Sequence, residues 1–403
     1  LSMFKYIFKL FLFLQAAFVI SCFLGQKFLP LQTEFLGQKF GEFVHQPLLW
    51  SRANFDGFHY LSIARNGYGY LEQMFFPFYP KLIRFFCPLF NSFIFSGLFI
   101  SSLFFILCLK LLSDLLSGEG ENKKAIKKTL LFLVLSPTSF YFLSVYTESL
   151  FLFLILLSFW LARKKKWLLA GLTAGLTSYT RLVGICLLPA LVCEYYESES
   201  GRKMKERIKS VRIGLIYKFR IEYLIYFFKS RWVHLKNLFF IFLSAWGLLA
   251  HAYYVKKTCD GWLYFIKIRP SFGGQRLANK LIMPYQVFWR YLKMIFTVNP
   301  KSFIYFNVWF EFLTALLFLG LLAWGWYKRK QNKIKTSWLV FSSLVYLLPT
   351  LTGTFSSMPR YVLTCFPCFL VLAKLKLPKI IYFFSGALLL LCAALFARGY
   401  WIA

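Results

Sequence analysis

The chain is poor in charged residues, and above all in acidic ones. Asp and Glu together number 15 in 403 residues, against 48 Lys and Arg, and charged residues make up only 16% of the sequence. A soluble domain carries roughly 25% charged residues. Because hydrophobic residues account for 59% of the chain, this shortage excludes an ordinary soluble globular protein and indicates an integral membrane protein.

Several signatures of familiar chemistries are also missing. The sequence has no D-x-D motif, no P-loop and no glycine-rich dinucleotide fingerprint, so it supports neither a nucleotide-sugar site with a bound metal nor a nucleotide-binding fold. The nine cysteines show no repeated spacing. Cys365 and Cys368 have redox or metal spacing, but they stand in an apolar segment without a partner pair. The sequence therefore predicts no metal site and no certain cofactor, and it leaves a need for a divalent metal open.

Long apolar runs fill most of the chain instead. Runs of about 20 residues recur along it, each long enough to cross a hydrocarbon core of roughly 30 Å. They predict an all-α polytopic membrane protein, 1–403 as one domain, with about eleven transmembrane helices. The expected spans are Phe4–Gly25, Ser92–Leu112, Leu130–Phe142, Ser149–Leu161, Trp167–Thr180, Leu182–Tyr195, Asn237–Val255, Ser302–Tyr327, Thr336–Leu351, Tyr361–Ala373 and Ile380–Ala397.

Basic residues predict how the first span is oriented. Lys5 and Lys9 stand at its start, so we expect a cytoplasmic N-terminus and an uncleaved signal anchor. The segment 26–91 then forms a long first outer loop. Loops longer than about 15 residues without regular structure are usually functional. We therefore expect this loop to be catalytic and to carry short interfacial helices.

Two later segments are also rich in Lys and Arg. We expect 197–236 to be cytoplasmic, with Ile213–Phe228 as a helix lying in the membrane interface. The second outer loop, 256–301, is basic as well, which predicts either an anionic ligand there or a different threading of the chain. The net charge of +33 is better explained by anionic lipid headgroups than by nucleic acid.

One polar stretch stands out within the apolar sequence. Ser51–Pro80 contains Asp56, one of three aspartates in the chain, with His59 one helical turn later. A carboxylate beside a membrane is costly unless it is hydrated, paired or used in chemistry. Two interpretations are open at this point: Asp56 is a catalytic residue, or it is only the N-cap of a short helix over Gly57–Arg65.

The residues around Asp56 follow a defined pattern. Asn54–Ala64 with Gly67 and Tyr68, and then Phe75–Pro80, correspond to W-D-G-x-H-Y-L-x-I-A-x-x-G-Y and F-F-P-x-Y-P, except that Phe55 replaces the tryptophan. This pattern resembles the first-loop motif of the PIG-V-like mannosyltransferases, relatives of the GPI mannosyltransferase that adds the second mannose, within the GT-C class. Later stretches that fit in the same order are Ser136-Pro137-Thr138-Ser139, Tyr146-Thr147-Glu148-Ser149, Thr180-Arg181 and Pro359-Arg360-Tyr361. The resemblance extends from about Ser51 to Phe369.

The resemblance implies a GT-C-like helical bundle and an inverting mannosyl transfer. The donor would be a polyprenyl-phosphate sugar, the acceptor a lipid or glycan, and the site extracytoplasmic, with membrane lipids around it and no nucleic acid as partner. Asp56 would be the general base, and arginines would stabilise the leaving phosphate. The expected substrate-binding residues are His59, Tyr60, Phe76, Tyr79, Glu148, Arg181, Arg360 and Tyr361.

Two other classes of function fit part of the sequence. A polyprenyl-linked lipid flippase or transporter would carry ionisable residues at mid-membrane, and Glu311 is the main acid placed there. A non-catalytic scaffold would not need Asp56, Arg181 and Arg360 to converge. A position of Asp56 near the membrane surface favours transfer, and a position at mid-membrane favours transport.

Overall fold

The computed structural model describes residues 2–33, 40–198, 234–259, 261–272, 280–331 and 334–402. Within these residues the regular structure consists of α-helices and short 3-10 turns, with no β-strand. The expected interfacial helix Ile213–Phe228 lies outside the described residues. The all-helical fold class is thus confirmed for the part of the chain that the structure describes.

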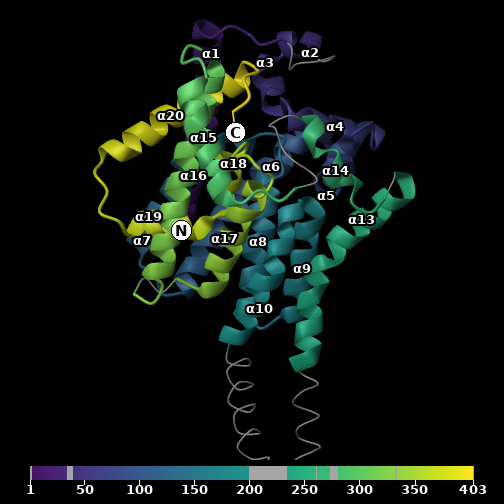
Figure 1. The fold of residues 1–403 in the computed structure, drawn as a ribbon, viewed down its shortest axis with the longest axis vertical. Helices are drawn as coiled ribbons and strands as arrows, with labels where there is room; N and C mark the ends of the chain where they lie inside the picture. Colours follow the sequence, from purple (N-terminus) through teal and green to yellow (C-terminus); the bar gives the residue numbers. More distant parts are fainter. Residues whose placement is uncertain are drawn as a thin grey trace, which may run out of the picture.

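Five helices among the described residues are long and apolar enough to cross a membrane. They are α1 (Ser2–Phe28), α6 (Phe93–Gly118), the helical run His234–Thr258 that ends in α13 (Trp246–Thr258), α16 (Phe303–Tyr327) and α20 (Ile380–Ala397) (Figure 1). Each of them coincides with a predicted span. The number of spans found by length and composition is therefore five among these residues, rather than eleven.

The other predicted spans fold as shorter helices. They are α7 (Lys123–Leu135), α8 (Glu148–Arg163), α9 (Trp167–Thr180), α10 (Leu187–Glu197), α17 (Thr336–Thr350) and α19 (Phe366–Lys374). The shortest has 9 residues and, at 1.5 Å per residue, covers about 14 Å, less than half of a hydrocarbon core. Helices of this length cross a bilayer only in combination with the segments that continue them.

The predicted span Leu130–Phe142 is wrong in its limits. Its helix, α7, begins earlier, because the side chain of Asn122 caps it by accepting a 2.8 Å hydrogen bond from a backbone amide. The helix ends before Ser136, whose backbone is not helical, as expected for a residue that precedes proline. The chain continues as a 3-10 turn over Ser139–Leu143.

Short helices occupy the two segments predicted as outer loops. The first segment holds α2 (Phe40–His45), α3 (Pro47–Trp50), α4 (Asp56–Asn66) and α5 (Phe78–Phe90), and the second holds α14 (Tyr264–Lys267) and α15 (Pro284–Thr297). A further short helix, α18 (Met358–Tyr361), joins α17 to α19. In Figure 1, α4, α5 and α14 lie above α9, and α5 contacts both α4 and α9. These helices form a cap over one end of the bundle.

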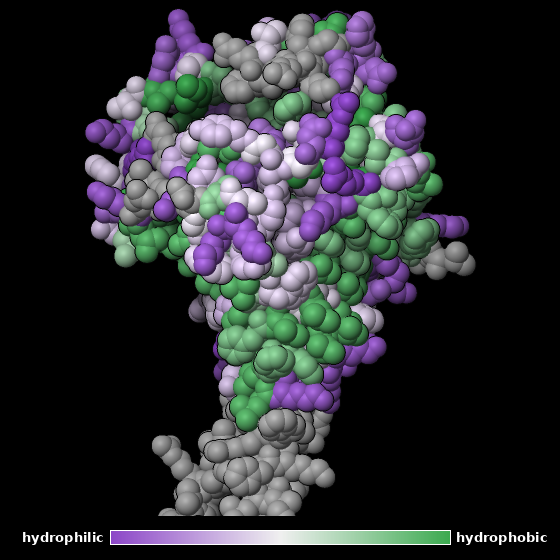
Figure 2. Space-filling model, turned by 90° about the vertical axis from the view of Figure 1, so that its right-hand side faces the viewer, coloured by the Kyte–Doolittle hydropathy of each residue, from purple (hydrophilic) through white to green (hydrophobic). Residues whose placement is uncertain are grey.

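Helix α8 runs through the middle of the bundle. It packs between α6 and α9, and most of its side chains are buried. Its first residue is Glu148 and its last is Arg163, so these two residues lie about 22 Å apart along the helix. On the face shown in Figure 2, mostly apolar residues cover the narrow lower part of the described molecule, and a more hydrophilic surface lies above it. This pattern matches a bundle set in a membrane with its short helices at the surface.

Glycines allow α9 to pack closely on the run His234–Thr258. A Cβ atom built on Gly175 would lie 1.8 Å from Nε1 of Trp246, and one on Gly171 would lie 1.8 Å from the carbonyl oxygen of Phe240. Both glycines lie on one face of α9, four residues apart. Small residues at this spacing let helix backbones approach each other within a membrane.

Ion pairs tie the helix ends together at the Arg163 end of the bundle. Arg163 lies 2.8 Å from Glu119 and 2.8 Å from Glu194, and Lys335 lies 3.0 Å from Glu119. These contacts join the ends of α6, α8 and α10 to the start of α17. The site described next lies at the other end of α8.

Candidate active site

The segment before α4 is held in an unusual backbone conformation. Asn54 donates a 2.9 Å hydrogen bond to the carbonyl of Phe396 and accepts one of 2.7 Å from the hydroxyl of Tyr146. Phe55 then has φ of 55° and ψ of −117° and is the N-cap of α4, without a side-chain capping bond. The helix begins at Asp56, so the interpretation of Asp56 as an N-cap is wrong. A bulky residue at positive φ is strained, and such strain is common at functional sites.

Gly57 brings the start of α4 against the turn that precedes α8. A Cβ atom on Gly57 would lie only 3.2 Å from the carbonyl oxygen of Val145. On the same turn, the amide of Val145 donates a 2.8 Å hydrogen bond to the carbonyl of Arg52. The D-G pair of the first motif and the Y-T-E-S motif therefore meet directly.

Four charged side chains from four parts of the chain converge here. Arg360 donates a 2.7 Å hydrogen bond from Nη1 to Oδ2 of Asp56, and its Nε lies 2.8 Å from Oε1 of Glu148 in an ion-pair contact. Arg181 donates a 2.6 Å hydrogen bond from Nη1 to the same oxygen of Glu148. Two carboxylates and two guanidinium groups thus form one charge-balanced cluster, the Asp56 cluster, which joins residues up to 304 positions apart.

Burial differs among the four members of the Asp56 cluster. The side chain of Glu148 is completely buried, and those of Arg360 and Arg181 are 6% and 10% exposed. Asp56 is the most accessible, with 20% of its side chain exposed. Its Oδ2 is the oxygen that pairs with Arg360. Asp56 is therefore the member of the cluster that a substrate reaches most easily.

Aromatic rings surround the two guanidinium groups. Arg360 lies 5.4 Å from the ring centre of Tyr141 and 5.2 Å from that of Tyr146, and Arg181 lies 5.0 Å from that of Tyr361. Burial alone lowers the pKa of Arg360, but Glu148 and Asp56 outweigh it and raise that pKa well above its ordinary value. Arg360 therefore stays cationic at any physiological pH.

Glu148 carries an unsatisfied group inside the cluster. Its second oxygen, Oε2, is buried and has no hydrogen-bond partner among the described residues. A buried carboxylate oxygen without a donor is costly. The two arginines beside Glu148, both bound through its other oxygen, offset part of this cost.

His59 and Tyr60 lie on α4 but make contacts of a different kind. Nδ1 of His59 lies 3.0 Å from Oε1 of Glu72, and the imidazole stacks on the ring of Phe75 at 4.9 Å between centres. Tyr60 is buried and packs edge-on against Phe75. The sequence interpretation did not single out Glu72, although it is the acid nearest to the F-F-P-x-Y-P run.

Phe76 and Tyr79, predicted to contact substrate, serve as packing residues in this structure. Tyr79 is fully buried, and its hydroxyl lies within hydrogen-bond distance of the carbonyl of Gly97 and the hydroxyl of Ser101. Phe76 packs against His251 at 4.4 Å between ring centres. Both side chains hold the cap to the bundle and expose almost no surface to a sugar. A substrate contact through them stays a prediction.

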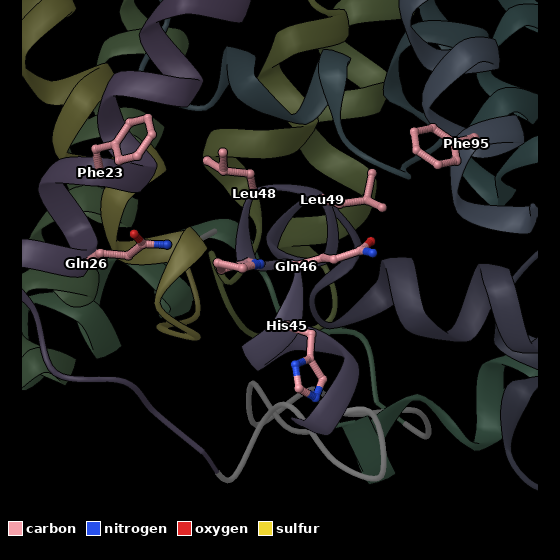
Figure 3. Close-up of a pocket in the computed structure, with 8 residues that line it drawn as sticks. Phe23, Gln26, His45, Gln46, Leu48, Leu49 and Phe95 are labelled. Atoms are coloured by element: carbon pink, nitrogen blue, oxygen red, sulfur yellow. The ribbon is translucent and has the colours of Figure 1, made fainter.

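An open pocket of about 420 Å³ lies beside the cap but apart from the Asp56 cluster. Figure 3 shows that its lining comes from the end of α1, the α2–α3 segment and the start of α6. It is lined by Phe23, Gln26, His45, Gln46, Pro47, Leu48, Leu49 and Phe95. No member of the Asp56 cluster lines it. Among the described residues, no group of three or more His, Cys, Asp and Glu side chains is arranged to hold a metal ion.

The spanning helices and the buried cluster define a helical integral membrane protein with a polar site at one end of its bundle. Over residues 3–254 the chain matches the family model described as Mannosyltransferase (PIG-V), and it belongs to that family. The chain is thus a membrane mannosyltransferase, a glycosyltransferase that takes a sugar donor and a lipid or glycan acceptor. No curated protein and no solved structure matches it. The matched residues include Asp56, Glu148 and Arg181 but end before Arg360.

Proposed function

We propose that the enzyme transfers mannose from a polyprenyl-phosphate donor to a hydroxyl of a lipid or glycan acceptor, with inversion at the anomeric carbon. The observation that carries this proposal is the 2.7 Å contact between Arg360 and Asp56. It puts a carboxylate able to take a proton next to a cation able to hold a phosphate. An inverting transfer needs one of these groups on each face of the anomeric centre, so the sugar of the donor has to enter between them.

The proposed reaction is a single displacement. The acceptor hydroxyl gives its proton to Asp56 while its oxygen bonds to the anomeric carbon. The bond from that carbon to the phosphate oxygen breaks, and its electron pair leaves with the polyprenyl phosphate. Arg360 and Arg181 stabilise the charge of the leaving group. An inverting transfer needs no second carboxylate as nucleophile, so Glu148 is assigned to holding the two arginines in place.

We further propose that this site lies on the extracytoplasmic side. Three features support that orientation. Helix α7 begins with the basic residues Lys123, Lys124, Lys127 and Lys128, and α8 ends in the basic run from Arg163 to Lys166. Asp56 lies at the opposite end of α8. Positive charge favours the cytoplasmic side of a membrane. In this arrangement 26–91 and 256–301 are outer segments, and the shorter helices complete about eleven passes.

The test compares two aspartate variants of the purified enzyme, Asp56→Asn and Asp114→Asn. Asn keeps the shape of Asp56 but accepts no proton, and the loss of a general base costs on the order of 10²–10⁴ in rate. Asp114 is an exposed residue on α6 that pairs with Lys110, so its variant should transfer at the wild-type rate. The assay measures transfer from polyprenyl-phosphate mannose. Near wild-type transfer by Asp56→Asn would exclude Asp56 as the base.

A further inference from the structure

The position of Arg360 depends on the loop that leads to it. Arg360 is the third residue of α18, a helix of only 4 residues, which is too short to fix itself in place. The loop from α17 to α18 contains two residues at positive φ, Gly353 at 91° and Ser357 at 66°. Such a loop adopts one conformation only when its neighbours hold it.

Helix α15 supplies those neighbours. Arg290 donates a 3.0 Å hydrogen bond to the carbonyl of Gly353. The next residue of α15, Tyr291, also brings its hydroxyl to the loop, where it accepts a 3.1 Å hydrogen bond from the amide of Phe355 and lies 3.1 Å from Oγ1 of Thr354. The ring of Phe355 is fully buried, 4.8 Å from the ring centre of Tyr291.

The hydroxyl of Tyr291 in turn donates to a carboxylate in a spanning helix. Its acceptor is Oε2 of Glu311 on α16, at 2.5 Å, and both side chains are buried. Because the single hydroxyl proton of Tyr291 goes to Glu311, Thr354 must be the donor to Tyr291, and its Oγ1 accepts a 3.1 Å hydrogen bond from the amide of Ser356. The hydrogen bonds from the amide of Ser356 through Thr354 and Tyr291 then all point the same way and end on the carboxylate of Glu311. Hydrogen bonds in such a chain strengthen one another.

The far side of α18 is fixed separately. Thr138 donates a 2.6 Å hydrogen bond to the carbonyl of Pro359, the residue directly before Arg360. The short helix is thus held between Thr138 on one side and the Tyr291–Glu311 pair, acting through the loop, on the other. Thr138 belongs to the S-P-T-S stretch, whereas Tyr291 and Glu311 lie beyond residues 3–254 that match the family.

We propose that Tyr291 and Glu311 are positioning residues that hold the α17–α18 loop so that Arg360 meets Asp56 and the phosphate of the donor. This inference rests on the proposed function of Arg360. It also gives a role to Glu311, the main acid that the sequence places at mid-membrane. A buried carboxylate in a spanning helix needs a specific use, and here that use is to accept the last hydrogen bond of the loop rather than to carry a transported ion.

The first arm of the test does not depend on activity. Tyr291→Phe removes the hydroxyl and keeps the ring, which frees the amide of Phe355. Amide hydrogen exchange over 351–361 of the purified full-length protein should become about 10-fold faster, since a freed amide exchanges through local opening. The matched control is Tyr346→Phe, which also removes a buried hydroxyl that bonds to α16, at the carbonyl of Ala315, and should leave exchange in this segment unchanged. Unchanged exchange in Tyr291→Phe would overturn the proposal.

The second arm measures kcat/KM for the donor. Because a misplacement of about 1 Å costs up to 100-fold in rate, Tyr291→Phe and Glu311→Leu should each lose roughly 10-fold. Glu311→Gln keeps an acceptor for Tyr291 and should restore most of the rate. In an Arg360→Lys background the Tyr291→Phe change should lower kcat/KM little further. The proposal would be overturned if Tyr346→Phe lost as much kcat/KM as Tyr291→Phe. It would also be overturned if Tyr291→Phe caused its full loss of kcat/KM in the Arg360→Lys background.

The two arms separate this inference from the function on which it rests. A wild-type protein that transfers no mannose would overturn the proposed function. The exchange data would still support or overturn the link between Tyr291 and the loop.

Discussion

At the scale of single residues, the sharing of Arg360 between two carboxylates suggests how the base is activated. In the structure Oδ2 of Asp56 accepts a hydrogen bond from Arg360, so that oxygen is not free to take a proton from an acceptor hydroxyl. A donor phosphate that takes the guanidinium of Arg360 would displace Asp56 from it. Under the proposed function, donor binding thus releases the base only when there is a sugar to transfer.

Glu148 gives a sharp residue-scale prediction, because one of its oxygens contacts both arginines. Glu148→Gln removes the carboxylate that the two buried arginines share and leaves Arg360 with Asp56, and removal of one partner from a buried ion pair costs about 3–5 kcal/mol. We expect a clear fall in the melting temperature and loss of transfer in the remaining folded enzyme. A melting curve in detergent and a transfer assay measure the two effects.

The matched control for that prediction is Glu119→Gln. Glu119 also bridges two cations, Arg163 and Lys335, but at the opposite end of α8. This variant should lose stability and keep its rate per folded molecule. Equal loss of rate in both variants would mean that Glu148 acts only through stability.

The sequence predicted much of this site but not its contacts. The motifs around Asp56, Glu148, Arg181 and Arg360 predicted that these side chains converge, and the structure brings them together. The positive φ of Phe55, which displaces Asp56 from the capping position, leaves no signal in the residue type. The partner of Arg360 lies 304 positions away, and no local pattern encodes such a distance.

At the scale of helices, hydropathy predicted that a helix is present more accurately than it predicted where the helix begins and ends. The limits of α9 and α20 agree with the predicted spans, because a basic residue stands directly before and after each helix. The limits of α7 do not, since a cap at Asn122 and a proline after Ser136 moved both ends. Capping and proline effects of this kind act on one or two residues and do not appear in a hydropathy average.

The contact of α9 with the run His234–Thr258 provides an element-scale prediction. The methyl group that Gly175→Ala adds would overlap Trp246, because a Cβ atom at this position would lie only 1.8 Å from Nε1 of Trp246. Overpacking of a tight contact costs about 1–3 kcal/mol, so the melting temperature should fall. Gly320→Ala on α16 is the control: a Cβ atom there meets no atom within 4 Å, and alanine is the better helix former. A melting temperature of Gly175→Ala equal to that of Gly320→Ala would contradict a close helix contact.

At the scale of the whole molecule, the two charged clusters mark the two ends of the bundle. The Asp56 cluster lies at the start of α8, beneath the cap of short helices, and the ion pairs of Arg163 lie at its end. Lysines begin α7 and follow α8 at the Arg163 end. The distribution of positive charge predicts that this end faces the cytoplasm and that the Asp56 cluster faces the opposite compartment, as we propose above.

Labelling of single cysteines tests this orientation. The background replaces Cys87, Cys193 and Cys259, the free cysteines that are not buried, with serine. Tyr70, 87% exposed beside the C-terminal end of α4, and Lys166, exposed in the turn after α8, are then changed to cysteine one at a time. A membrane-impermeant maleimide added to sealed membrane vesicles whose cytoplasmic side faces inward should label the Tyr70→Cys variant at once and the Lys166→Cys variant only after the membrane is permeabilised, because the bilayer separates the two positions. The reverse pattern would place Asp56 on the cytoplasmic side. The donor would then have to present its sugar there, and the assigned roles of Asp56 and Arg360 would hold only with the opposite topology.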